Sequence, residues 1–503
     1  MSFGIYDGCP GSGFWERDNS HFPLPMSRHL WELFMPPYDN GTRRGLARYG
    51  SLIERFDFAR VKGRLYLKTC FVKDPDERAI RNHTSVEAVD SKLWRQDREQ
   101  WKEIRDDLRR RLLRLSAKDP LQMDRATLQA HIADSRKIFA EGAFRHFIQQ
   151  PSSMFPVGEW VLNACAWSGC SSAAALSLLK GSHAGSADFG SPGRLDEYVD
   201  RIITGFDIID LTLRELPQLH SGTLASWADA SGSRQSSPSL MSDVENEIRD
   251  RVPAGQRKEF DAGLCEARIA YGLHDEDVRI TYLWPLGLLR RSALAVAGHL
   301  IDSGRLAQSD HIFQTTPLEL DNLLDGSAEP GPDELARRAD EFAVWKDEQV
   351  PQSFGTKQTV SFEGVSSRCT RVNRAILFYL GQMEDHLSES STEPSWSLMV
   401  AGLPASPGRY EGWARVVREA LDFRKLQKGD VLVAPTTSPA YNVILPLIGA
   451  VVTDRGGALS HSAIVAREFG IPAVVGTDQA TSRIPDGARI LVDGDRGFVA
   501  VRS

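Results

Sequence analysis

The chain has 503 residues, enough for two to four domains at roughly 150 residues each. It carries 60 Lys and Arg residues against 67 Asp and Glu residues, and the resulting net charge of −7 argues against general nucleic-acid binding. Hydrophobic residues make up 41% and charged residues 25%, which is ordinary for a globular protein and excludes large-scale disorder.

The six cysteines are scattered without a CxxC pair, so we expect neither a disulfide framework nor a zinc site built on paired cysteines. The N-terminal segment lacks the basic and apolar regions of a secretory signal. The most apolar stretch, Val157–Leu179, contains Glu159 and Asn163 and is typical of a buried helix rather than a membrane span. We therefore expect a soluble, cytoplasmic protein that does not contact membranes.

Helical periodicity dominates the chain up to residue 386. The helical patterns are preceded by a segment in which apolar and polar residues alternate around Gly63, and this alternation predicts a β-hairpin over Arg60–Val72. Apolar residues then recur at helical spacing in a series of predicted helices: Ser85–Leu115, Arg125–Gln149, Val157–Leu179, Leu195–Leu216, Asp243–Ile269, Arg279–Asp302, Asp333–Asp347 and Arg371–His386. Two polar stretches, Ala228–Ser242 and Leu387–Ser397, are predicted to be a loop and a linker.

Short β-branched strands separated by Gly, Asp and Pro turns follow the linker. The predicted strands are Trp413–Val417, Asp430–Ala434, Gly449–Thr453, Ala473–Gly476, Arg489–Val492 and Phe498–Val501. Two predicted helices, Tyr441–Ile448 and Ser460–Phe469, interrupt them, which indicates a compact α/β domain. The predicted fold class is thus α+β multidomain, with a mostly helical domain at 1–386, a linker at 387–397 and the α/β domain at 398–503.

The segment VVTDRGGALSHSAIVAREFGIPAVVG, which begins at Val451, carries the most chemical information. Its predicted strand leads through two glycines to His461, which opens a helix. The first turn of a helix binds phosphate well, because its N–H groups are unpaired and the helix dipole is positive there. A histidine in this position can act as a nucleophile towards phosphorus. The alternative is that His461 only caps the helix or pairs with Asp454.

This segment closely resembles the swivelling phosphohistidine domain of the phosphoenolpyruvate synthase and pyruvate phosphate dikinase family, and so does Ala434–Pro439. One departure is Ser462, where that family usually has Ala. The resemblance implies a β/β/α domain that swivels between two sites and carries the phosphoryl group on His461. It also implies phosphate contacts from the residues around this histidine: Thr453, Gly456, Gly457, Ser460, Ser462 and Arg467.

Two earlier segments carry a second resemblance. FWERDNSHFP, which begins at Phe14, is similar to the start of the acceptor-binding domain in rifampin phosphotransferases, and Gly304–Leu324 is similar to its late segment. The resemblance implies that residues 1–386 bind the acceptor of the phosphoryl group. The implied acceptor-binding residues are Trp15, Arg17, Asp18 and His21. The alternative is a docking turn held by polar groups.

The sequence YGLHDEDVR lies between two predicted helices and places three carboxylates beside a histidine. His274 is our candidate for the base that takes the acceptor's proton, because its ordinary pKa lies near neutrality. Asp275, Glu276 and Asp277 would orient it, and Arg279 would neutralise charge on the phosphoryl group. The alternatives are a solvated acidic connection, with His21 or a carboxylate as the base.

The order of these domains resembles the large subunit of phenylphosphate synthase and the 4-cresol phosphorylating enzyme of aromatic compound degradation. That resemblance implies a dikinase-type reaction in which ATP, phenol and water give aryl phosphate, AMP and phosphate. It also implies that a separate ATP-grasp subunit holds ATP with Mg²⁺, since no Gly-rich, Lys-bearing ATP-grasp start precedes the linker. We expect no metal site in this chain. The alternatives are an antibiotic or flavonoid phosphotransferase with a bulkier acceptor, and a non-catalytic phosphocarrier.

Overall fold

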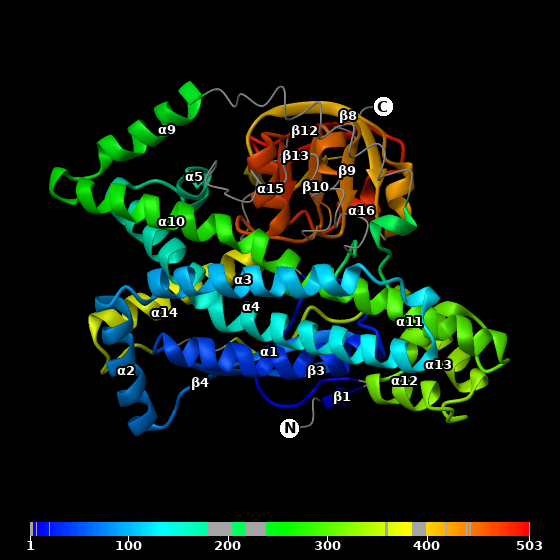
Figure 1. The fold of residues 1–503 in the computed structure, drawn as a ribbon. Helices are drawn as coiled ribbons and strands as arrows, with labels where there is room; N and C mark the ends of the chain where they lie inside the picture. The colour runs from blue at the N-terminus through cyan, green and yellow to red at the C-terminus, as the bar shows by residue number, and fades with distance from the viewer. Residues whose placement is uncertain are drawn as a thin grey trace.

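A computed structural model of the chain describes residues 4–6, 8–19, 21–179, 203–216, 238–357, 361–384, 399–418, 420–437, 441 and 444–501. It shows the predicted α+β class, with a layer of long helices and two separate sheets (Figure 1). The predicted linker Leu387–Ser397 lies outside the described residues.

The first sheet has five strands in the order β1-β3-β4-β2-β5. Its centre is the predicted hairpin, in which Lys62 and Gly63 both adopt positive φ angles of 46° and 75° and form the tight turn that a twisted hairpin requires. The strands are β1 (Gly4–Tyr6), β2 (Trp15–Arg17), β3 (Ile53–Val61), β4 (Arg64–Phe71) and β5 (Ser353–Phe354). Strand β2 thus brings the N-terminal segment against β4, at one wall of the site described below.

Long helices make up most of the first 384 residues. They are α1 (Arg28–Arg48), α2 (Pro75–Asp90), α3 (Leu93–Ser116), α4 (Arg125–Ser168), α5 (Ser172–Ser177), α9 (Pro238–Arg251), α10 (Arg257–Val278), α11 (Trp284–Asp302), α12 (Pro317–Leu324), α13 (Pro332–Asp347) and α14 (Ser367–Glu384). Helix α4 is central, because α1, α3, α10, α11 and α14 all pack against it.

Two glycines let α1 approach α4 closely. A Cβ atom on Gly41 would lie 2.7 Å from the Cβ of Phe147, and one on Gly45 would lie 2.7 Å from the carbonyl oxygen of Ile148. Because these positions carry no side chain, the two backbones come close enough for Tyr38 to stack on Phe147, with ring centroids 4.0 Å apart. The packing of these helices therefore builds part of the site.

Several predicted helices have different bounds in the structure. The predicted helix over residues 85–115 is two helices, because Lys92 takes a left-handed conformation with φ 53°. The helices predicted over 125–149 and 157–179 are largely one, since α4 continues through Pro151 and Pro156 under the packing of its neighbours. The prediction over 243–269 is broken near Pro253, which separates α9 from α10.

Other predictions fail for local reasons. In the described part of the predicted helix 195–216, the carboxylates of Asp207 and Asp210 bind nearby backbone N–H groups, and residues 203–216 form an irregular turn. The described part of the predicted helix 441–448 has 3₁₀ rather than α-helical conformation, at Tyr441 and in the turn Leu445–Leu447. The segment YGLHDEDVR is not a connection, because it completes α10 and leads into a π-helical turn, Arg279–Leu283, before α11.

The second sheet has eight strands in the order β6-β13-β12-β8-β9-β10-β11-β7 and defines the C-terminal domain. The six predicted strands are confirmed, and β6 and β7 were not predicted. Strands β8 to β11 run parallel to one another. The elements are β6 (Met399–Ala401), β7 (Leu403–Ser406), β8 (Arg409–Val416), β9 (Val431–Ala434), β10 (Ala450–Thr453), α15 (His461–Phe469), β11 (Ala473–Val475), α16 (Ala480–Arg483), β12 (Arg489–Asp493) and β13 (Phe498–Val501).

The C-terminal domain sits on the helical layer, with α15 facing α10 (Figure 1). One hydrophobic cluster runs continuously across this junction and includes Met154 and Tyr271 on one side and Leu459 and Ile464 on the other. At its edge, Nη1 of Arg467 donates to the hydroxyl of Tyr271 at 3.2 Å. The junction is therefore packed, and it determines where α15 points.

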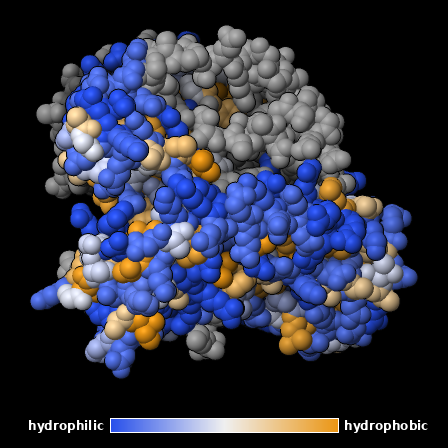
Figure 2. Space-filling view, turned by 60° about the vertical axis from the view of Figure 1, so that its left-hand side comes forward, coloured by the Kyte–Doolittle hydropathy of each residue, from blue (hydrophilic) through white to orange (hydrophobic). Residues whose placement is uncertain are grey.

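On the face drawn in Figure 2, hydrophilic residues predominate and hydrophobic residues occur in small separate groups. The exposed large hydrophobic residues are likewise spread over different elements, for example Ile80, Leu121 and Val344. None of the described helices has the length and apolar character needed to cross a membrane.

Candidate functional site

His461 lies at the carboxyl end of the parallel strands, where open α/β sheets commonly bind ligands. Two loops meet there, one after β9 and one after β10. Backbone bonds join them: the N–H of Asp454 donates to Ala434 at 3.0 Å, and the N–H of Arg455 donates to Pro435 at 2.9 Å. The loops thus hold His461, on the second, beside Thr437, on the first.

The turn before α15 leaves the helix N-terminus without a side-chain cap. Ser460 occupies the N-cap position, but its hydroxyl donates to the carbonyl of Gly457 at 2.8 Å instead of accepting from a helix N–H. Gly456 has a φ of 116°, and a Cβ there would lie 2.6 Å from Oγ of Ser460. The first-turn N–H groups beside His461 are therefore suited to hold an anionic group.

The imidazole of His461 is set up as a neutral nucleophile. Its Nδ1 lies 2.8 Å from Oγ1 of Thr437. Burial lowers the pKa of His461 to about 3, so the ring carries no charge at neutral pH. In the tautomer in which Nδ1–H donates to Thr437, the reactive lone pair is on Nε2.

The residues predicted to bind phosphate differ in where they lie relative to the cavity. Ser460 lines the cavity beside His461, and the hydroxyl of Ser462 lies 3.1 Å from that of Ser460. Thr453 is buried at the end of β10, where its carbonyl accepts from Thr477. Gly456 and Gly457 shape the turn, as described above.

Arg467 was predicted to contact phosphate, but in the structure its side chain points away from His461. Its guanidinium donates to the carbonyls of Ala405 and Ala458 and to the hydroxyl of Tyr271, and it does not line the cavity. Because its three nitrogens are all engaged away from His461, Arg467 braces the loop before α15 and reaches the helical region. A direct contact with phosphate is not part of this arrangement.

A cavity of about 1550 Å³ lies between the helical region and the C-terminal domain. Thr436, Thr437, Leu459, Ser460, His461 and Ile464 contribute one wall. The other walls come from α1, α4, α14, the first sheet and its loops. His461 and residues predicted to bind the acceptor, Asp18 and His21, therefore line the same cavity.

Aromatic side chains form one part of the cavity. They include Phe22, Phe34, Tyr38, Phe147, Phe206 and Tyr282. Their rings contact one another, mostly in tilted or edge-on pairs with centroids 5.2 to 6.0 Å apart. Such a wall favours flat apolar ligands, because ring–ring contacts add to the gain from burying area.

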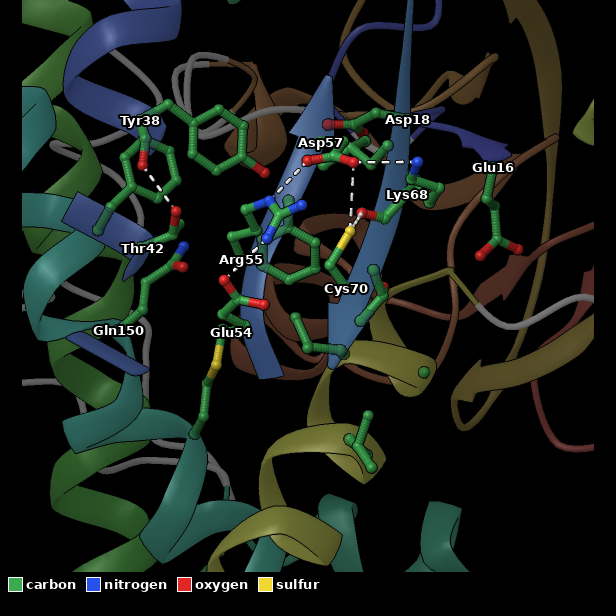
Figure 3. Close-up of a pocket in the computed structure, with 18 of the residues that line it drawn as sticks. Glu16, Asp18, Tyr38, Thr42, Glu54, Arg55, Asp57, Lys68, Cys70 and Gln150 are labelled. Atoms are coloured by element: carbon green, nitrogen blue, oxygen red, sulfur yellow. Dashed lines mark hydrogen bonds and ion pairs between the residues drawn. The ribbon is translucent and has the colours of Figure 1, made fainter. Parts of the chain in front are cut away.

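Paired charges form the opposite part, on β3 and β4 (Figure 3). Asp57 is its centre: its Oδ1 accepts from Nε of Arg55 at 2.9 Å, and its Oδ2 lies 3.0 Å from Nζ of Lys68. Arg55 also pairs with Glu54 at 2.8 Å. These contacts lower the pKa of Asp57 although burial alone would raise it, so the network stays ionised at neutral pH.

The four predicted acceptor-binding residues split between the two faces of the N-terminal segment. Asp18 and His21 line the cavity, and they lie within 3.1 Å of each other. Trp15 is buried in a separate small cluster, and Arg17 donates to Asn19. Neither Trp15 nor Arg17 lines the cavity, because alternate residues of β2 point to opposite sides and Glu16 takes the cavity side.

The candidate base His274 and its neighbours Asp275 and Glu276 lie within α10, but their side chains are outside the described residues. Arg279 is buried in the π-helical turn and does not line the cavity. The same segment supplies Asp277, whose Oδ2 lies 2.8 Å from Nδ1 of a residue that sequence analysis did not single out, His146.

His146 and Gln150 both line the cavity, one helical turn apart on α4. Amide Nε2 of Gln150 lies 3.2 Å from Nε2 of His146. Their i, i+4 spacing was visible in the sequence, but the face that they share was hidden because the predicted helix ended at Gln149. The sequence indicated Thr437 only as part of the segment Ala434–Pro439, because its role depends on the contact with His461 that the fold creates.

Nowhere in the described ranges do three His, Cys, Asp or Glu side chains gather in a way that would hold a metal ion. Several carboxylates that line the cavity are instead paired with other side chains: Asp18 with His21, Glu54 and Asp57 with Arg55, and Glu77 with Arg81.

The geometry around His461 agrees with a comparison against protein families. The family model described as "PEP-utilising enzyme, mobile domain" matches residues 426–497. The C-terminal domain belongs to this family. The match includes both loops that meet at His461 and the whole of α15, so the C-terminal domain is the mobile domain of this chain.

Several curated relatives are similar to the chain. A phosphoenolpyruvate synthase of Aeropyrum pernix is 47% identical over 114 residues, which is 22% of this chain and 14% of that protein. A rifampicin phosphotransferase of Streptomyces sviceus is 44% identical over 102 residues, 20% of this chain and 12% of that protein. Both matches have about the length of the mobile domain.

The chondramide synthase cmdD of Chondromyces crocatus is 31% identical over 248 residues, 48% of this chain and 6% of that protein. This match is longer than the mobile domain, so part of it lies in the preceding helical region. In all three cases the match spans only a small part of the relative's length.

Proposed function

We propose that this chain transfers a phosphoryl group from His461 to a hydroxyl of an aromatic acceptor bound in the cavity. The observation that carries the proposal is the position of His461, which opens into the same cavity as the aromatic rings and the Asp18–His21 pair. A histidine that only capped its helix would not need to face a cavity built largely by another part of the chain.

The chemistry of the carrier follows from the surroundings of His461. In the Nδ1–H tautomer held by Thr437, Nε2 attacks phosphorus, and the uncapped N–H groups of α15 hold the phosphoryl oxygens. The ring then carries a positive charge shared with Nδ1, which makes it a good leaving group. Transfer to the acceptor returns His461 to its neutral form with the Nδ1 proton still in place.

The size of the cavity favours a bulky acceptor. At about 1550 Å³ it exceeds the roughly 300–1,000 Å³ of typical small-molecule sites. A simple phenol would fill only a small part of it. We therefore favour an acceptor of the antibiotic or flavonoid class, and the similarity to a rifampicin phosphotransferase supports this choice. A phenol or cresol is the second candidate, because the aromatic wall suits a single ring as well.

We propose that ATP, with its Mg²⁺, is bound by a separate ATP-grasp subunit, in line with the resemblance to phenylphosphate synthase. The overall reaction is then ATP, acceptor and water giving the phosphorylated acceptor, AMP and phosphate. A non-catalytic phosphocarrier would deliver the phosphoryl group to another protein. The cavity beside His461 favours a small-molecule acceptor over that alternative, because this chain itself supplies the aromatic and charged walls that an acceptor would contact.

The experiment separates the two half-reactions. The chain is phosphorylated with potassium phosphoramidate, freed of reagent, and mixed with rifampicin, the flavonoid quercetin or 4-methylphenol, while ³¹P NMR follows the phosphohistidine signal. We expect that signal to decay into a phosphate ester with at least one acceptor, and the His461→Ala protein to form no ester. Decay to inorganic phosphate alone with every acceptor would overturn the proposal. A parallel sample with ATP and Mg²⁺ should give no phosphohistidine, whereas efficient labelling would place the nucleotide site in this chain.

A further inference from the structure

Two histidines besides His461 line the cavity, and each has an aspartate at its Nδ1. They differ in what their Nε2 atoms can do. In the first, Nδ1 of His21 lies 3.1 Å from both carboxylate oxygens of Asp18. In the second, Nδ1 of His146 lies 2.8 Å from Oδ2 of Asp277. A carboxylate at Nδ1 fixes the tautomer and directs Nε2 as a proton acceptor, which is the arrangement of a general base.

The first pair is rigid at its carboxylate end and accessible at its imidazole end. Asp18 is nearly buried, with 4% of its side chain exposed, whereas 37% of the His21 side chain is exposed. The backbone N–H of His21 also donates to Oδ1 of Asp18 at 3.0 Å. Among the described residues no hydrogen bond reaches Nε2 of His21, and the ring packs edge-on against Phe206 with centroids 5.5 Å apart. Nε2 is thus available at the aromatic end of the cavity.

The second pair is more occupied. Only 10% of the His146 side chain is exposed, and Gln150 lies against Nε2 at 3.2 Å. An acceptor would have to displace this amide before reaching the ring. On the opposite wall, Arg55 and Lys68 are ion-paired cations and cannot take a proton. Of the two histidines, His21 is therefore the one whose Nε2 can contact an acceptor directly.

The ionisation of His21 is compatible with this role. Burial lowers its pKa, but the charge of Asp18 and the hydrogen bond to it raise the pKa, and the net direction is upward from the ordinary value of about 6.5. A base whose pKa lies close to the working pH transfers protons most efficiently. By contrast, burial lowers the pKa of His461 to about 3, which suits a nucleophile that must stay neutral.

We propose that His21, oriented by Asp18, is the general base of the acceptor half-reaction; this inference rests on the proposed function and deepens it. As the acceptor oxygen forms its bond to phosphorus, its proton passes to Nε2 of His21. The bond between phosphorus and Nε2 of His461 breaks, and its electron pair returns to the His461 ring. The imidazolium of His21, stabilised by Asp18, then releases the proton to water.

The test uses the full chain, phosphorylated with phosphoramidate, and two phenols of similar size that differ in acidity, 4-methylphenol and 4-nitrophenol. Since 4-methylphenol is protonated at neutral pH, its transfer needs the base, and His21→Gln should slow it by about 10²- to 10⁴-fold. 4-Nitrophenol is far more acidic and already partly ionised at neutral pH, so the same variant should slow its transfer far less. Asp18→Asn should show the same selective loss, because it removes the orienting charge.

His83→Gln is the matched control. His83 also pairs with a carboxylate, Glu87 at 3.3 Å, but 77% of its side chain is exposed and it lies away from the cavity. It should leave both rates unchanged, and thermal melts should show that the His21 variant is folded. Equal slowing of both phenols would overturn the proposal, because it indicates loss of binding. An unchanged His21→Gln rate, or a selective loss in His146→Gln instead, would overturn it too. No transfer by the wild-type chain to either phenol or to the larger acceptors would refute the proposed function itself.

Discussion

The hydroxyl oxygen of Thr437 lies 2.8 Å from Nδ1 of His461. The two residues are 24 positions apart: Thr437 lies in the loop after β9, and His461 opens α15 after the loop that follows β10. The backbone bonds of Asp454 and Arg455 hold these two loops together. When the Thr437 hydroxyl accepts from Nδ1–H, the lone pair of Nε2 is left to face the phosphoryl group. Three of our predictions concern this histidine or the cavity that it faces.

Removing the hydroxyl should impair the carrier. In Thr437→Val, Nδ1 of the His461 ring loses its hydrogen bond to this hydroxyl, and a lost hydrogen bond of this kind is worth about 0.5–1.5 kcal/mol. We expect phosphorylation of His461 by phosphoramidate to slow by roughly two- to tenfold, as measured by ³¹P NMR. Thr437→Ser keeps the hydroxyl and should restore the rate. A Val variant as fast as the wild type would show that the contact does not matter to the nucleophile.

The low pKa of His461 predicts an unusual pH profile. An ordinary imidazole, with a pKa of about 6.5, is about nine-tenths protonated at pH 5.5 and loses its nucleophile accordingly. Burial lowers the pKa of His461 to about 3, so its ring stays neutral as the pH falls through this range. The ratio of the phosphorylation rate of His461 to that of free N-acetylhistidine should therefore rise about tenfold from pH 8 to pH 5.5. A constant ratio would mean that His461 titrates normally.

The mobile domain was largely predictable because its signals are local. β-branched strands, glycine turns and the helix start at His461 all appear within short stretches of sequence, and the structure has the predicted strands and helix α15. The helical region was harder, since α4 continues through Pro151 and Pro156 against local preference. Its continuity depends on the helices packed around it, which single-sequence periodicity does not contain.

The site was predictable only where one segment supplies both partners. Asp18 and His21 are three residues apart, so both could be named, and the structure brings them together. The pairing of His146 with Asp277 joins residues 131 positions apart, and no local pattern indicates it. Arg467 shows the converse: its sequence position near His461 indicated a phosphate contact, but its side chain turns to Ala405, Ala458 and Tyr271.

The aromatic wall should determine acceptor affinity without affecting the carrier. Tyr38 stacks on Phe147 and lines the cavity beside Thr42 and Gln150 (Figure 3). Tyr38→Ala removes one ring of this wall, and aromatic pairs contribute about 0.5–1.5 kcal/mol beyond the area that they bury. We expect the acceptor's KM to rise about tenfold, while phosphorylation of His461 is unchanged. Tyr38→Phe should retain wild-type affinity. An unaltered KM in Tyr38→Ala would place the acceptor elsewhere in the cavity.

The contact between Arg467 and Tyr271 should affect only one of the two half-reactions. It joins the mobile domain to α10 in the arrangement that faces His461 into the cavity, and it is one of the polar bonds across the junction. If the domain swivels away to be recharged, this bond must break each time.

Tyr271→Phe keeps the buried ring but removes the hydroxyl, and it should destabilise the docked arrangement by about 1 kcal/mol. Transfer from phosphorylated His461 to the acceptor should then slow by roughly fivefold, whereas phosphorylation of His461 by phosphoramidate should stay at or above the wild-type rate, because undocking exposes the ring. Tyr49→Phe is a suitable comparison, since that buried hydroxyl donates to Asp97 within the helical region and Tyr49 neither lines the cavity nor crosses the junction. Equal slowing of both half-reactions in Tyr271→Phe would indicate a general loss of structure and would count against a docked state held by this bond.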